Sequence, residues 1–204
     1  MVFDHLLTGL NKINFKRRLL SILLVLIIFY LDLHLPAKVF AYFIIGLALL
    51  ALIFDLIRRK NGGAFLKRVI NMYPSETYEN DKFLSDITVF LFSTTILFFV
   101  FPKTIFLISI IIYILADNCG HILGVLIHKG KLFWNKDKTI LGAIGNVLGV
   151  LISLTIISQA LGVKLDIIPI AIISLAVIII DSINAPDNIL MPWVISIILL
   201  FSIN

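Results

Sequence analysis

The sequence has little cysteine and little charge. Its single cysteine, Cys119, cannot form an internal disulfide, so nothing indicates an oxidising compartment. Charged residues make up only 14% of the chain, hydrophobic residues make up 60%, and the mean hydropathy is +1.10. An ordinary soluble domain is only about half apolar, so this composition excludes one and predicts a polytopic membrane protein.

Two further signals are absent. No G-x-x-x-x-G-K-[ST] loop occurs, which excludes the nucleotide-binding fold that soluble proteins build around that loop. No small-residue cleavage site closes the first apolar run, so we expect no cleavable signal peptide. The net charge of +5 would hint at nucleic acid in a soluble protein. Here membrane topology explains it better, and we expect no nucleic-acid partner.

Seven apolar stretches approach the roughly 20 residues that a membrane helix needs. The fold class that they predict is all-α, a polytopic integral membrane bundle of about six to seven transmembrane helices, because the last stretch is short enough to be re-entrant. We expect residues 1–204 to form one transmembrane domain, with an N-terminal helical hairpin over 1–57 and a core over 58–204. The stretches are 19–35, 37–57, 84–101, 104–127, 139–161, 165–182 and 188–203.

The basic residues predict the orientation. With the amino terminus inside, the cytoplasmic segments 1–18, 58–83 and 128–138 hold fourteen Lys and Arg residues, and the opposite side holds three. Cytoplasmic loops of membrane proteins carry such an excess. We therefore expect a multi-pass protein of the cell membrane whose functional residues face the cytoplasm.

Asp117 lies inside one of these apolar stretches. At a rise of about 1.5 Å per residue it sits well inside the hydrocarbon. An ionisable residue there is costly and by default indicates a functional site. Solvation at a loop end is as good an explanation as function for Asp55, Asp86 and Asp137, but it explains Asp117 less well.

Lys138 and Thr139 open the next apolar stretch, with Gly142 and Gly145 behind them. Free N–H groups at a helix start attract phosphate, and glycines let backbone donors approach it closely. Glycines at this spacing also serve close helix packing in lipid, which is our interpretation of Gly149. Lys138 itself either pairs with phosphate or acts only as a topology anchor.

The longest polar stretch, residues 58–82, contains a short segment over 64–72 with amphipathic spacing. Arg68 in this segment either contacts lipid headgroups or binds a substrate phosphate. Glu76 follows it in a turn before the third apolar stretch.

Three blocks of the sequence follow the pattern of one protein family. That pattern has an Asp late in one span with a small residue and a Gly after it, then a Lys-Thr-x-x-Gly block that opens the next helix. Near the carboxyl end come an acidic residue, an Asp-Asn pair and a Pro. The matching residues are Asp117, Gly120, Gly124, Lys138, Thr139, Gly142, Asp181, Asp187, Asn188 and Pro192. In this order they resemble the dolichol kinase and phytol kinase (polyprenol kinase) family, which is distantly related to the membrane CDP-diglyceride synthases.

The resemblance covers roughly residues 58–204. Within it, Glu76 resembles a family Glu that follows a basic helix. The sequence departs from the pattern at Leu141, where the family usually has Glu, and at Asp181, where we would expect the longer Glu.

The resemblance implies a CTP-dependent kinase that phosphorylates an isoprenoid or polyprenol-type lipid alcohol, with Mg²⁺ as cofactor. Mg²⁺ is held by one or two carboxylates together with substrate oxygens, and Asp117, Asp181 and Asp187 could supply them. Lys138 would pair with the phosphates as the fourth catalytic residue. The nucleotide contacts implied beside Lys138 are Gly120, Gly124, Thr139, Gly142, Asn188 and Arg68.

Two alternatives stay open. A cytidylyltransferase that makes a CDP-activated lipid from a lipid phosphate would carry a long charged carboxy-terminal motif, which is absent here. A non-catalytic transporter would favour carboxylates at the membrane midplane and matched repeats, whereas these carboxylates crowd one predicted face. The partners that we expect are the nucleotide, the lipid alcohol and membrane lipids, and the sequence is compatible with a homodimer.

Overall fold

The computed structural model describes residues 15–61, 85–126, 130–163, 165–183 and 186–203. This part of the chain is all-helical and has no strand; one isolated β-bridge joins Lys131 and Thr139. Each of the seven predicted apolar stretches corresponds to one helix, so the all-α prediction is confirmed. The helices are α2 (Phe15–His34), α3 (Ala37–Asn61), α5 (Asp86–Val100), α6 (Lys103–Leu126), α7 (Ile140–Leu161), α8 (Ile167–Ser182) and α9 (Asp187–Ser202).

Local chemistry sets several helix ends. Pro36 and Pro102 each separate two helices, where proline lacks the N–H that would continue a helix. The Ser85 side chain caps α5 by accepting a hydrogen bond from the Thr88 N–H at 3.3 Å. Gly162 ends α7 in the left-handed conformation, with φ of 68°, which a residue with a Cβ rarely adopts. The predicted hairpin at Pro36 is therefore present as α2 and α3.

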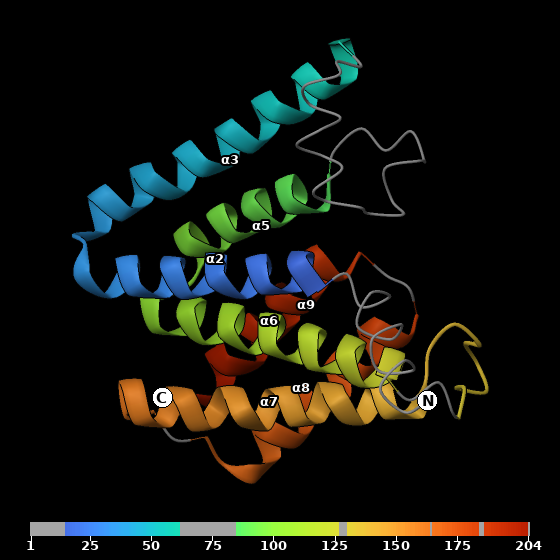
Figure 1. Ribbon diagram of the computed structural model, residues 1–204. Helices are drawn as coiled ribbons and strands as arrows, with labels where there is room; N and C mark the ends of the chain where they lie inside the picture. Colours follow the sequence, from blue (N-terminus) through green and yellow to red (C-terminus); the bar gives the residue numbers. More distant parts are fainter. Residues whose placement is uncertain (1–14, 62–84, 127–129, 164, 184–185, 204) are drawn as a thin grey trace.

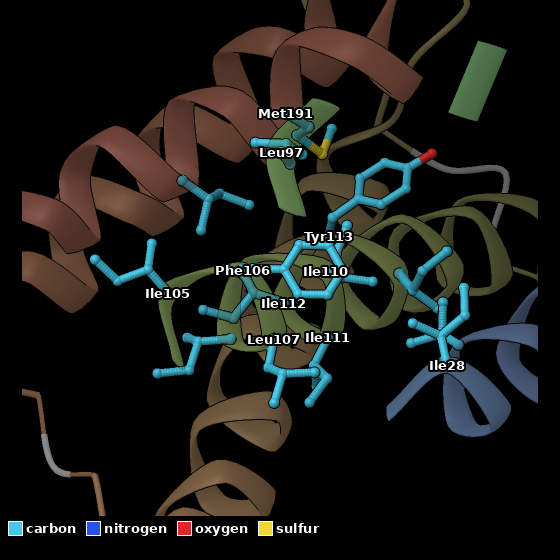
Figure 2. Packing of buried hydrophobic residues seen from close by; sticks show 14 of the residues in the cluster. Ile28, Leu97, Ile105, Phe106, Leu107, Ile110, Ile111, Ile112, Tyr113 and Met191 are labelled. Carbon is cyan, nitrogen blue, oxygen red and sulfur yellow. The ribbon is translucent and has the colours of Figure 1, made fainter. Parts of the chain in front are cut away.

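Helix α6 lies at the centre of the bundle and contacts α2, α5, α7, α8 and α9. Figure 1 shows it between α2 and α7. Every residue from Ile105 to Ile114 is buried, which is the pattern of a helix covered on all sides. Figure 2 shows its side chains among Ile28 of α2, Leu97 of α5 and Met191 of α9. The helix that carries Asp117 is thus in contact with five of the other six described helices.

Helices α6 and α7 run antiparallel with their backbones in direct contact. A Cβ built on Gly149 would lie 2.5 Å from the Leu115 carbonyl oxygen and 2.5 Å from the Ala116 Cα. A Cβ on Gly145 would lie 2.5 Å from the Cys119 carbonyl oxygen. Small residues allow this approach, and van der Waals packing drives helix association where lipid removes the hydrophobic difference. The packing interpretation of Gly149 is confirmed, and Gly145 also packs against α6.

Helix α2 is attached to α6 by an ion pair at each end. The Arg18 guanidinium donates a hydrogen bond to the Asp117 carboxylate at one end. At the other end the Lys103 ammonium lies 3.7 Å from the buried Asp32 carboxylate and donates to the Asp32 carbonyl at 2.5 Å. Because the positive residue is on α2 in one pair and on α6 in the other, the two pairs specify one antiparallel register.

Three helices are long and apolar enough to cross a membrane: α3 over Ala37–Ile57, α6 and α7. The other described helices are apolar but shorter. Large apolar side chains such as Tyr42, Phe54 and Leu175 are exposed on the outer faces, and contiguous exposed apolar surface of this kind marks contact with lipid or another protein. These features indicate a membrane location. The number of crossings, six to seven, stays a prediction.

The contact between α6 and α7 can be tested by adding one methyl group. We expect Gly149→Ala to lower the free energy of unfolding by about 1–3 kcal/mol, because the new Cβ would push the two backbones apart. Thermal unfolding in detergent measures the change. Gly46→Ala is the matched control, since nothing lies within 4 Å of its built Cβ and alanine favours a helix. Equal transition temperatures for both variants would contradict the close approach.

The topology can be tested by labelling single cysteines in a Cys119→Ser background. We expect Asp137→Cys, in the loop before α7, to react with a membrane-impermeant reagent from the cytoplasmic side only. Asp166→Cys, in the exposed connection after α7, should react only from the other side because α7 crosses between them. Labelling of both positions from one side would refute the crossing.

Candidate functional site

The polar and charged residues singled out by the sequence gather at one end of the bundle. The start of α2, the end of α6, the start of α7, the end of α8 and the start of α9 all lie there, on the right in Figure 1. The α2–α3 turn and the carboxyl terminus of the chain lie at the other end. Alternating helix directions therefore bring together residues that are far apart in the sequence.

Lys138, just before α7, pairs with Asp181 near the end of α8. The Lys138 Nζ donates to the Asp181 Oδ1 at 2.6 Å, and both side chains are partly buried. The Asn146 amide, about two helical turns further along the chain, donates to the other Asp181 oxygen at 3.2 Å. Both oxygens of this carboxylate therefore have protein donors, and the pairing of a predicted basic residue with a predicted acidic one links α7 to α8.

Asp117 is paired with a residue that the sequence did not single out for this role. Arg18, on α2, donates to the Asp117 Oδ2, and the two side chains are 16% and 20% exposed. A buried charge is tolerated only when it is paired and hydrogen-bonded, so the intramembrane position of Asp117 is explained at least in part by this partner. Lys138 does not pair with Asp117, because it binds Asp181.

Asp187 lies before the predicted span 188–203, at the polar end of α9. Its pKa is raised to about 6: burial is the largest cause, the nearby Asp117 and Asp181 charges also raise it, and the Asn188 N–H and Lys138 lower it. Its Oδ1 accepts a hydrogen bond from that N–H at 2.8 Å. The four predicted catalytic residues thus lie close enough to influence one another electrostatically.

Asn188 also belongs to this end of the bundle. Its Oδ1 accepts a hydrogen bond from the Tyr113 hydroxyl, which comes from the buried part of α6. This bond fixes the orientation of the amide and leaves its NH₂ group as the end with donors to offer a ligand. Tyr113 therefore positions Asn188.

Thr139 and Gly142 have structural partners at the start of α7. The Thr139 hydroxyl accepts a hydrogen bond from the Gly142 N–H at 3.0 Å and so caps the helix. A Cβ on Gly142 would lie 3.3 Å from the Gly120 carbonyl oxygen, and one on Gly124 would lie 3.2 Å from the Thr139 hydroxyl. These residues serve capping and packing here, and phosphate contact by them stays a prediction.

Gly120 has a particular role at the site. A Cβ there would lie 1.6 Å from the Asn146 side-chain oxygen, so the Asn146 amide occupies the space that a side chain on α6 would fill. Because Gly120 has no side chain, Asn146 can lie against α6 and still reach Asp181. This contact therefore requires a residue without a side chain at position 120.

The loop from residue 130 to 139 holds Lys138 in place. Gly130, with φ of 76°, starts a tight loop in which its carbonyl oxygen accepts from the Ile140 N–H at 2.7 Å. The Leu132 N–H donates to the Lys138 carbonyl oxygen at 2.9 Å. The Asn135 amide donates to the Ser182 carbonyl oxygen at the end of α8 at 2.7 Å. The loop is thus fastened to the same helix end that carries Asp181.

Two of the candidate residues, Arg68 and Glu76, lie outside the described residues, as does the segment 64–72. Nothing in the structure bears on their predicted contacts.

The residues that are present fit a Mg²⁺ ion bound with a phosphorylated ligand, but not an ion held by protein alone. Among the described residues no group of three or more His, Cys, Asp or Glu side chains is placed to hold a metal. Mg²⁺ usually needs only one or two carboxylates, with phosphate and water oxygens for the rest. The Asp117 charge contributes to the raised pKa of Asp187, so the two carboxylates are near each other and one or both could bind the ion. That Asp117, Asp181 and Asp187 supply ligands to the ion stays a prediction.

Sequence reasoning missed three residues of this site. Arg18, Asn146 and Tyr113 contact the candidate residues Asp117, Asp181 and Asn188 respectively. Arg18 stands in a run of basic residues that topology already explained, and the other two lie within apolar stretches. Asn146 and Tyr113 could have been found as polar residues inside a span, the criterion that selected Asp117.

In comparisons with protein-family models, with curated proteins and with solved structures, nothing matches this chain. The functional argument therefore rests on the residues themselves and on how the fold brings them together.

The capping role of Thr139 is testable by substitution. We expect Thr139→Val to lower the free energy of unfolding by about 1 kcal/mol, because the Gly142 N–H loses its acceptor, and Thr139→Ser to retain most of it. Thermal unfolding measures both. Thr155→Val is the control, since that exposed hydroxyl donates only to the Leu151 carbonyl oxygen within α7. If Thr139→Val and Thr155→Val behave alike, the cap contributes nothing to stability.

Proposed function

We propose that this protein is a membrane kinase of the polyprenol-kinase type, which transfers the terminal phosphate of CTP to an isoprenoid or polyprenol-type lipid alcohol. One observation carries the proposal. Lys138, Asp181, Asp187 and Asp117, which come from four different segments, lie within electrostatic reach of one another at one end of the bundle. A bundle held together only by apolar packing has no need for three carboxylates and a lysine in one place.

Each of these groups has a part in phosphoryl transfer. The hydroxyl oxygen of the alcohol attacks the γ-phosphorus, the bond from that phosphorus to the β–γ bridging oxygen breaks, and CDP leaves with the bridging oxygen. Lys138 binds the phosphates as a point charge. When bound, Mg²⁺ would supply positive charge to the phosphates. The residue that would hold it is Asp117, which leaves Asp187 for the proton of the alcohol.

Asp187 is the best-placed acceptor for the proton of the alcohol. Its raised pKa lies near the pH of the cytoplasm, and a general base works best when its pKa is close to the working pH. Asp181 keeps the ammonium of Lys138 directed into the site through the 2.6 Å ion pair. Asn188, held by Tyr113, offers its NH₂ group to the nucleotide or to the alcohol.

The membrane supplies the other substrate. A polyprenol-type alcohol is apolar except for its hydroxyl, so it would lie in the bilayer beside the bundle, with the hydroxyl at the polar end. We propose that the helices cross the membrane several times with this end at the cytoplasmic face, where nucleotide is available. That orientation is supported by the fourteen-to-three distribution of basic residues.

The cytidylyltransferase and transporter alternatives are distinguished by the products. Purified protein is incubated with each of the labelled nucleoside triphosphates and a panel of polyprenols and lipid phosphates. We expect a lipid phosphate and a nucleoside diphosphate. Recovery of a CDP-lipid and pyrophosphate would establish the cytidylyltransferase instead, and the absence of any turnover would leave a non-catalytic protein.

Two substitutions test the assigned residues. We expect Asp117→Asn to abolish transfer while the protein stays folded, because the amide oxygen can still accept from Arg18 but no longer carries the charge that a divalent ion requires. Lys138→Met should lose both nucleotide affinity and rate. Thermal unfolding and product formation are measured side by side, with Lys136→Met, an exposed lysine of the same loop, as the control. Wild-type turnover in Asp117→Asn would remove the main support for this site.

A further inference from the structure

Arg18 is a largely buried charged residue at this end of the bundle that the proposed function does not use. It lies on α2, outside the segment that resembles a kinase family, yet its guanidinium donates directly to Asp117. Its side chain is only 16% exposed, so the contact is made inside the bundle and not on the outer surface. A basic residue that reaches an essential carboxylate from a distant segment calls for an explanation.

The charges at the site suggest one. Two cations, Arg18 and Lys138, are paired with Asp117 and Asp181, and Asp187 is a third carboxylate nearby. A nucleoside triphosphate is a polyanion, and it cannot bind beside three carboxylates unless the cations turn toward it. Carboxylates that lose their cations must then gain another positive charge, because an unpaired buried charge is strongly unfavourable. A metal-bound nucleotide supplies negative phosphates for the two cations and a positive metal ion for the carboxylates.

We propose that Arg18 is a second phosphate-binding residue of this site, which alternates between Asp117 and the phosphates of the nucleotide. The inference rests on the proposed function and adds a nucleotide contact to it. Arginine suits this role because its planar group forms two parallel hydrogen bonds to a phosphate, whereas Lys138 acts as a point charge. The same Asp117 oxygens serve Arg18 in one arrangement and the metal in the other.

Helix α2 can stay in place while Arg18 moves. The Asp32–Lys103 pair holds the far end of α2 to α6, 14 residues away from Arg18 along α2. Near Arg18 itself, the Asn118 amide donates to the Ser21 hydroxyl at 3.4 Å. The attachment of α2 therefore does not depend on the Arg18–Asp117 contact alone, and a change of partner costs only the side-chain movement.

The test is equilibrium binding of Mg²⁺-CTP to the full-length protein in detergent, below the unfolding temperature of every variant. We expect Arg18→Gln to weaken binding about tenfold or more, the loss that a charge-assisted hydrogen bond implies. Arg18→Lys should recover part of it. Lys103→Met is the matched control, because it breaks the other ion pair between α2 and α6 without touching the site.

Each outcome decides a different point. Weaker binding in Arg18→Gln and in Lys138→Met, with normal binding in Lys103→Met, supports the inference. Normal binding in Arg18→Gln with weaker binding in Lys138→Met overturns the inference and leaves the proposed function standing. Equal loss in Arg18→Gln and Lys103→Met would make Arg18 a structural contact only, which also overturns it. A wild-type protein that binds no nucleotide refutes the proposed function and the inference together.

Discussion

The backbone contact between α6 and α7 determines where the site can form. Gly145 and Gly149 let the two helices approach until carbonyl oxygens of α6 lie where a Cβ would otherwise be. At that distance Asn146 lies over Gly120, and the loop before α7 brings Lys138 to the end of α8. In lipid, where apolar side chains gain little by leaving the solvent, close packing of this kind is the main attraction between helices. Separation of α6 and α7 would therefore move the lysine away from its carboxylates as well as weaken the bundle.

Charge pairing is the second constraint, and it operates at both ends of α2. Charged groups inside an apolar bundle must find partners, since the desolvation cost of an isolated charge is larger than any packing gain. Asp32 and Lys103 satisfy this at one end, and Arg18 and Asp117 at the other. The first pair serves the fold. The second involves Asp117, a residue that we assign to chemistry.

Much of the architecture could be predicted from the sequence, and less of the site. The helices were predictable because runs of about 20 apolar residues separated by Pro36, Pro102 or polar loops leave few alternatives. The grouping of Lys138 with Asp181 followed from helix alternation and the distribution of charge. The partners of Asp117 and Asn188 could not be predicted, because a contact across 99 or 75 residues depends on which faces of the helices meet. The glycines were ambiguous for the same reason: their spacing suits both packing and phosphate.

By itself the sequence determined that the chain is helical, that it belongs at a membrane, and that acidic and basic residues collect at the ends of helices. Those properties depend on the composition and on the order of residues within each short segment of the chain. Only the tertiary structure decided that α6 lies at the centre, that Arg18 reaches Asp117, and that Thr139 caps α7 with the Gly142 N–H as its donor. These outcomes depend on the rotation and separation of neighbouring helices, which the pattern of apolar residues leaves open when nearly every face is apolar.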